Sequence, residues 1–208
     1  MDISHPLATV TPTVDGDVLA VLAQNEATFT PGQLRRRLGR YSEAGIRKVV
    51  MRLTEQGIVH ADRVGNAVTY RLNRDHLAAG PIIELAHLQG TLLTRLEQHL
   101  TGWTVPPVYA AVFGSAARGE MTSSSDLDLL LVRPDDAPQS TWDEQVAELS
   151  RAVSAWTGND TRPLEYTRSE LARAAGERVL QDIADEGLTV AGTRAWLTRQ
   201  LRSTPDLT

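Results

Sequence analysis

The sequence predicts two domains of different fold class: a small helical domain that ends in a β-hairpin, and then a mixed α/β domain. Charge is the first reason, because residues 33–74 hold ten Lys and Arg against three Asp and Glu, whereas residues 75–208 hold eleven against nineteen. The second reason is the helical periodicity of apolar residues early in the chain. The third is a pair of strand-length apolar segments later in the chain, which flank a turn of small residues. We expect domains at 1–74 and 103–208, joined by a helical linker at 75–102.

Composition narrows the class of protein. The chain has 208 residues, of which 41% are hydrophobic and 23% charged, as in globular domains. It has no cysteine, which excludes disulfides and thiolate metal sites. Its first residues do not combine a basic region with an apolar core, and no apolar run approaches membrane-spanning length. We therefore expect a cytoplasmic protein that contacts no membrane.

Three helices and a hairpin are predicted in the first domain. After a short apolar helix, Thr30-Pro31-Gly32-Gln33 begins a second one, with Thr as cap and Pro at the first helical position. Ser42 caps a third helix, which ends at Gly57, and Gly65-Asn66 forms the tight turn of the hairpin. In this order of elements, residues 42–70 resemble the recognition helix and wing of winged helix-turn-helix domains.

Basic side chains lie off the apolar positions of the predicted third helix, and its first half is where recognition helices reach base edges. Arginines on the preceding helix and on the hairpin could contact phosphates. The resemblance implies a surface for duplex DNA, formed by Arg35, Arg36, Arg47, Lys48, Arg52 and Arg63. A winged helix that binds only proteins is the alternative.

In the linker, a stripe of apolar residues could pack on the second domain or on a second copy of the chain, forming a homodimer.

A glycine-serine turn and an acidic pair distinguish the second domain. An apolar segment, 108–113, precedes Gly114 and Ser115, and Asp126-Leu127-Asp128 opens the next apolar segment. Side chains two apart on a strand point to the same face, so Asp126 and Asp128 should lie side by side and suit Mg²⁺ bound together with substrate phosphates. Gly114 lets a ligand approach the backbone, and a helix starting near Ala116 would direct free N–H groups at a phosphate.

Gly-Ser, ten residues and then Asp-x-Asp, with Arg118-Gly119 and Ser125 in place, resembles the minimal nucleotidyltransferases of the polymerase-β superfamily. The resemblance covers residues 106–192 and implies an α/β (α+β) domain that transfers NMP from an NTP, expected to be ATP. It implies two Mg²⁺ ions held by Asp126 and Asp128, with phosphates at Gly114 and Ser115 and with Arg118 neutralising charge.

That superfamily uses a third carboxylate on a neighbouring strand, often Asp. Here the strand-like segment 162–166 offers Glu165, which we expect to complete the catalytic site. If Glu165 instead faces away from Asp126 and Asp128, a transcriptional regulator that only senses nucleotide is favoured. The resemblance also allows an antitoxin-like transferase that modifies a protein acceptor, such as a partner toxin.

Overall fold

The computed structural model describes residues 1–202, so the last six residues of the domain predicted at 103–208 lie outside the described part. The chain forms two compact units, which do not follow the predicted boundaries. One unit comprises His5–Gln89, and the other comprises Met1–Ser4 together with the described residues from Gly90 onward. The first residues therefore belong with the distant part of the sequence, and Ile3 is fully buried in the core of that second unit.

The His5–Gln89 unit has the predicted order of helices and hairpin. Thr30 caps α2 in a reciprocal capping box with Gln33, and the Ser42 hydroxyl accepts from the N–H of Gly45 at the start of α3. One bridge joins Phe29 to Tyr70 and so ties the segment before α2 to the hairpin. The winged-helix assignment itself stays a prediction. The elements are η1 (Pro6–Thr9), α1 (Val14–Ala23), α2 (Pro31–Leu38), α3 (Glu43–Glu55), β1 (Val59–Val64), β2 (Ala67–Leu72) and α4 (Ala79–Ala86).

A four-stranded mixed sheet, in the order β5–β4–β3–β6, forms the centre of the other unit. β3 is antiparallel to both β4 and β6, whereas β4 and β5 are parallel. Because β3 and β4 are the inner strands, their apolar side chains are buried on both faces, except for the half-buried Phe113 at the end of β3, as continuous apolar runs predict. β5 is an edge strand. The strands are β3 (Tyr109–Phe113), β4 (Leu127–Arg133), β5 (Thr161–Thr167) and β6 (Leu188–Ala191).

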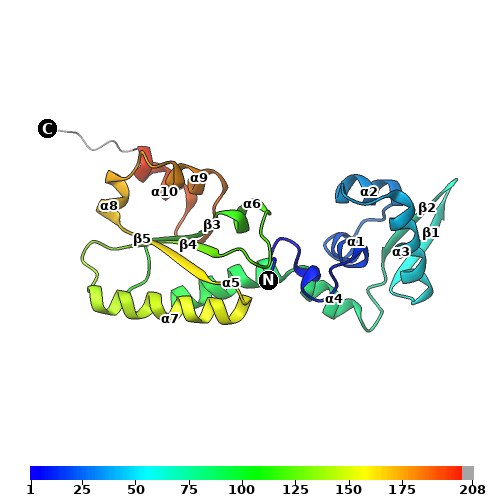
Figure 1. Ribbon diagram of the computed structural model, residues 1–208, viewed down its shortest axis with the longest axis horizontal. Helices are drawn as coiled ribbons and strands as arrows, with labels where there is room; N and C mark the ends of the chain where they lie inside the picture. The colour runs from blue at the N-terminus through cyan, green and yellow to red at the C-terminus, as the bar shows by residue number, and fades with distance from the viewer. Residues whose placement is uncertain (203–208) are drawn as a thin grey trace. The chain divides into compact units, whose positions relative to one another are not determined.

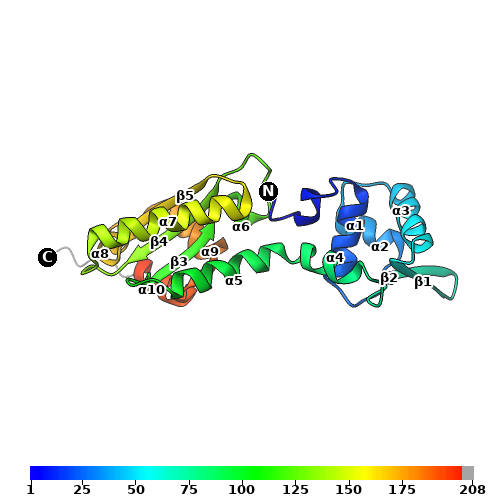
Figure 2. The same ribbon diagram turned by 90° about the horizontal axis from the view of Figure 1, so that it is seen from below.

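Helices cover both faces of this sheet (Figure 1). On one face, Leu127, Leu129 and Leu131 of β4 pack with α5 and α7, which lie side by side in Figure 2. On the other face, Leu130 and Val132 pack with α8, α9 and α10. The side-chain alternation of β4 thus assigns its apolar side chains to two cores, one on each face of the sheet. These helices are α5 (Leu88–Thr101), α7 (Gln139–Thr157), α8 (Arg168–Arg173), α9 (Arg178–Glu186) and α10 (Arg194–Arg202).

The segment 75–102 is not a separate linker. Its first helix, α4, contributes Ala79 and Ile82 to the core of the His5–Gln89 unit, whereas Leu92 and Leu96 of α5 lie in the core of the sheet unit. One apolar stripe in the sequence is therefore divided between two cores. None of the helices in residues 1–202 combines the length and apolar character needed to cross a membrane.

Candidate functional site

Gly114 follows β3 at the point where β3 lies beside Asp128 of β4, because Phe113 is the residue paired with Asp128. Gly114 has φ 69° and ψ −145°, a backbone conformation that is essentially restricted to glycine. A Cβ atom added to Gly114 would overlap Asp128 Oδ2 and lie 3.3 Å from its Cγ. Glycine is therefore required here both by the backbone and by the neighbouring carboxylate.

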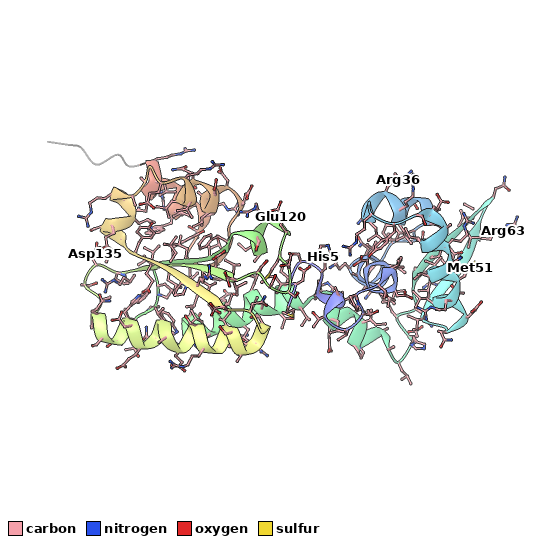
Figure 3. The ribbon with its side chains drawn as sticks, in the orientation of Figure 1. His5, Arg36, Met51, Arg63, Glu120 and Asp135 are labelled. Carbon is pink, nitrogen blue, oxygen red and sulfur yellow. The ribbon has the colours of Figure 1, made fainter. Side chains whose placement is uncertain are left out.

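Ser115 begins α6 (Ser115–Arg118), a single turn that ends at Gly119. The sequence predicted a helix whose N-terminus would bind phosphate, but four residues are too few to build a substantial helix dipole. The guanidinium of Arg118, at the end of this turn, donates through Nε to Glu120 Oε2 at 3.0 Å. This hydrogen bond is the main cause of the raised pKa of Arg118, and Figure 3 labels Glu120 just after this turn.

The acidic pair lies at the start of β4. Burial raises the pKa of the Asp128 carboxyl, and the charge of Asp126 raises it further, whereas Arg162 and Arg118 oppose the rise. A carboxylate that is disfavoured by burial and by a like charge is stabilised by a cation. Two carboxylates suit a Mg²⁺ ion whose other ligands are phosphates and water. Within residues 1–202, no group of three or more His, Cys, Asp or Glu side chains is placed to hold a metal ion. A metal ion bound by Asp126 and Asp128 would therefore need phosphate oxygens or water as its other ligands.

Hydrogen bonds hold the loop that precedes Asp126. The Thr122 N–H donates to Ser125 Oγ at 3.0 Å, and the Nδ2 of the buried Asn159 donates to the Ser125 carbonyl at 2.8 Å. The Leu127 N–H donates to the Asp160 carbonyl at 2.8 Å. Asp126 is therefore fixed between β4 and the turn that follows α7. Asn159 was not predicted from the sequence, because the carbonyl groups that its Nδ2 contacts are more than 30 positions away.

Glu165 does not lie where the sequence-based interpretation placed it. It pairs in register with Leu131, and its Oε2 accepts a hydrogen bond of 2.6 Å from Nε1 of Trp142, which belongs to α7. Leu131 and Trp142 lie on the sheet face opposite to that of Leu130, the face that Asp128 shares. The prediction that Glu165 faces Asp126 and Asp128 is therefore wrong.

Glu165→Ala is expected to leave nucleotide affinity unchanged and to destabilise the fold by about 1–2 kcal/mol, because the indole N–H of the buried Trp142 would lose its acceptor. Glu165→Gln retains an acceptor oxygen for the indole N–H and should therefore destabilise the fold less than Glu165→Ala. Urea unfolding and calorimetry with ATP measure the two effects separately. A loss of nucleotide binding in Glu165→Gln would return this residue to the site.

Arg162 takes the position beside the acidic pair. It is paired in register with Asp128 on the parallel strand, so the two side chains share one face. Arg162 Nη1 lies 2.9 Å from Asp126 Oδ2. Sequence reasoning missed Arg162 because the pairing register of β4 and β5 is not visible in the sequence. The odd separation of Arg162 and Glu165 does, however, require that they face opposite sides of one strand.

A pocket of about 140 Å³ adjoins this site. Gly114 and Arg118 line it on one side, and Asp182 and Glu186 of α9 line it on the other. Carboxylates accept hydrogen bonds and repel phosphate, so this pocket suits a hydroxyl or amino group of a ligand. These two acids stand four apart on one helix face, which is a pattern the sequence contains, but nothing in the sequence placed α9 beside Gly114.

The basic residues selected for DNA binding are exposed, but they are not equivalent. Arg47 pairs with Glu43 one turn earlier on α3 at 3.1 Å, and Lys48 is exposed beside it. Arg52 pairs with Asp15 of α1 and so ties two helices together. Arg63 extends from the hairpin in Figure 3 and donates to the Gly65 carbonyl.

Arg35 and Arg36 are exposed on α2. A groove of about 410 Å³ lies between the start of α2, the start of α3 and the hairpin, and Arg47 lines it together with Pro31 and Asn66. Among these side chains, Arg47 and Lys48 combine exposure with a place in the first half of α3. Arg52 is the one that the structure assigns most clearly to helix packing.

The match to a family model agrees with the chemistry of the acidic pair. Residues 95–184 match the family model described as nucleotidyltransferase domain. No curated protein matches the chain. Similar solved structures include a toxin–antitoxin with AMP-PNP (18% identity, TM-score 0.40, 54% of this chain and 82% of that chain). A mutant of the toxin–antitoxin MntA-HpeT is another (15%, 0.39, 54% and 82%).

A third similar structure is a tri-AMPylated HEPN toxin of Shewanella oneidensis in complex with the MNT antitoxin (16% identity, TM-score 0.38, 56% of this chain and 82% of that chain). At these TM-scores the likenesses add nothing to the assignment, which depends on the family match. Residues 95–184, which include Gly114, Asp126 and Asp128, are therefore similar to a nucleotidyltransferase domain.

Proposed function

We propose that this chain is a nucleotide-responsive DNA-binding protein whose nucleotidyltransferase domain binds Mg²⁺ and an NTP, with ATP expected. One observation supports this most strongly: the Asp128 carboxylate lies directly against Gly114 and beside Asp126, while Glu165 faces α7 on the opposite side of the sheet. The ligand groups for a metal–nucleotide complex are thus present, and the third carboxylate of a polymerase-like mechanism is not on their face.

In this proposal each side chain has a distinct task. Asp126 and Asp128 hold the metal ion, which supplies charge neutralisation to the triphosphate when bound. Gly114 lets a phosphate approach the backbone, and Ser115 offers its hydroxyl. Arg118, which is charged and exposed at the end of α6, attracts the anionic ligand.

Calorimetry with ATP, with Mg²⁺ and then with excess chelator, tests the proposal. Binding should be strong with Mg²⁺ and weak with chelator, since the two aspartates repel an unaccompanied triphosphate. Equal affinity in both conditions, or no binding in either, would refute the site.

Nucleotidyl transfer is the second candidate, and the family match and the intact Asp126–Asp128 pair favour it. The acceptor would lose its proton without help from a β5 carboxylate, so transfer should be slow unless the acceptor provides a base. The acceptor in this case would be a small molecule or a protein, including a toxin. Incubation with Mg²⁺ and α-labelled ATP, with and without cell lysate, separates the candidates: label on an acceptor indicates a transferase.

For the His5–Gln89 unit we propose binding of duplex DNA through the first half of α3. The support is the placement of Arg47 and Lys48 there, together with the exposed Arg35, Arg36 and Arg63 on adjoining elements. The basic excess of residues 33–74 predicts steep weakening with salt, since each bound phosphate releases counterions.

Arg47→Ala with Lys48→Ala should weaken specific DNA binding by about 1–3 kcal/mol for each base-reading side chain removed and should reduce the salt dependence. Arg151→Ala with Arg178→Ala changes net charge equally on the other unit and serves as the control. Selection from a random duplex library followed by gel shift measures both. If no duplex ligand is recovered at low salt, the DNA-binding proposal is wrong.

A further inference from the structure

We propose that Arg162 serves as a built-in cation of the nucleotide site and replaces one of the two divalent ions, so that the domain binds an NTP with a single metal ion. The inference depends on the proposed nucleotide binding and specifies how that site is charged. It concerns a residue that lies beside the acidic pair through strand pairing and is remote from it in the sequence.

The position of Arg162 is defined by the parallel pairing of β4 and β5. Arg162 lies in register with Asp128, and its Nη1 is 2.9 Å from Asp126 Oδ2. The Arg162 side chain is 65% exposed and that of Asp126 is 30% exposed, so a ligand can reach both. Arg162 therefore lies beside the two aspartates on their face of the sheet, where the sequence led us to expect a third carboxylate.

The net charge of this site therefore differs from that of a site with three carboxylates. Asp126 and Asp128 with a third carboxylate would carry three negative charges, enough to hold two divalent ions in front of a triphosphate. With Arg162 in that place, the same three positions carry a net charge of about −1. Two divalent ions beside a guanidinium would repel it, whereas one divalent ion and the guanidinium together can neutralise the phosphates.

The guanidinium is also suited to the ligand. Its planar fork of N–H donors matches phosphate oxygens, and it stays charged at all accessible pH values. Asp126 does not hold the guanidinium firmly, since an ion pair between side chains this exposed is screened by solvent and contributes little to stability. A phosphate can therefore take Arg162 from Asp126 at little cost, which leaves Asp126 available for the single metal ion.

Metal stoichiometry tests this inference without reference to turnover. Mn²⁺ is titrated, with free Mn²⁺ followed by electron paramagnetic resonance, in the presence of saturating non-hydrolysable ATP analogue. The full-length chain should bind one Mn²⁺ per nucleotide, and Arg162→Asp should bind two. Arg162→Ala should weaken analogue binding at saturating Mn²⁺ by roughly 5–30-fold, because one charge-assisted hydrogen bond to the phosphates is removed. Arg162→Lys should keep one ion and lose less affinity.

Arg151→Asp, an equal charge change at an exposed position of α7, is the matched control and should behave as wild type. Thermal unfolding establishes that each variant is folded. Two Mn²⁺ ions per nucleotide in the wild type, unchanged in Arg162→Asp, would overturn the inference and leave nucleotide binding in place. Absence of analogue binding in the wild type would instead refute the proposed function and this inference with it.

Discussion

Gly114→Ala is expected to abolish metal-dependent nucleotide binding and to lower the free energy of unfolding by about 1–3 kcal/mol. Two effects combine at this position. Alanine is strained at φ 69° and ψ −145°, and its Cβ would overlap Asp128 Oδ2. The Asp128 carboxylate would have to rotate away from Asp126, or β3 and β4 would have to separate locally. Either change removes the arrangement that binds the metal–nucleotide complex.

Gly119→Ala is the matched control for Gly114→Ala. Gly119 also has a positive φ, of 74°, but a Cβ there meets no heavy atom within 4 Å. Gly119→Ala should therefore lower the free energy of unfolding by about 1 kcal/mol, through backbone strain alone, and should leave nucleotide affinity intact. Urea unfolding and calorimetry on both variants measure the contrast. If Gly114→Ala binds ATP as tightly as Gly119→Ala, the close packing of Gly114 on Asp128 has no part in ligand binding.

Asp128→Asn should remove the part of the nucleotide affinity that depends on Mg²⁺ while making the unliganded fold slightly more stable at neutral pH. The folded-state pKa of Asp128 is raised from its ordinary value of 3.8, mainly by burial and then by Asp126. An acid with a raised pKa favours the folded state at low pH and loses this contribution as pH rises through the folded pKa. The stabilising effect of Asn should therefore be present at pH 7 and disappear below about pH 4.

Asp135→Asn should change the stability of the fold in the opposite direction, at an acid that lies outside the nucleotide site. Asp135, labelled in Figure 3, accepts hydrogen bonds of 2.9 Å from both the N–H and the hydroxyl of Ser169, and these lower its pKa. Its ionised form therefore favours the folded state above its ordinary pKa, so Asp135→Asn should destabilise the fold at pH 7 and leave nucleotide affinity unchanged. If Asp128→Asn also lowers the stability of the fold at pH 7, the carboxylates of Asp126 and Asp128 do not repel each other as proposed.

The sequence by itself determined the features that depend on short-range chain geometry. The capping residues Thr30 and Ser42 lie where α2 and α3 begin, because a cap acts on the backbone within three residues. Gly114 lies at the end of β3 and Asp128 in β4, because runs of apolar residues and a small-residue turn define strands locally. The match of residues 95–184 to a nucleotidyltransferase domain agrees with the resemblance found in the Gly-Ser and Asp-x-Asp motif.

Only the tertiary structure decided which residues complete the site. Strand alternation requires that Arg162 and Glu165 face opposite sides of β5, but the pairing register with β4 selects which of them stands beside Asp128. That register is set by contacts between strands some thirty residues apart, and it places Arg162 on the site and Glu165 against Trp142. Likewise, one apolar stripe over 75–102 cannot show that α4 and α5 serve different cores, since helical periodicity marks a buried face and not the partner that buries it.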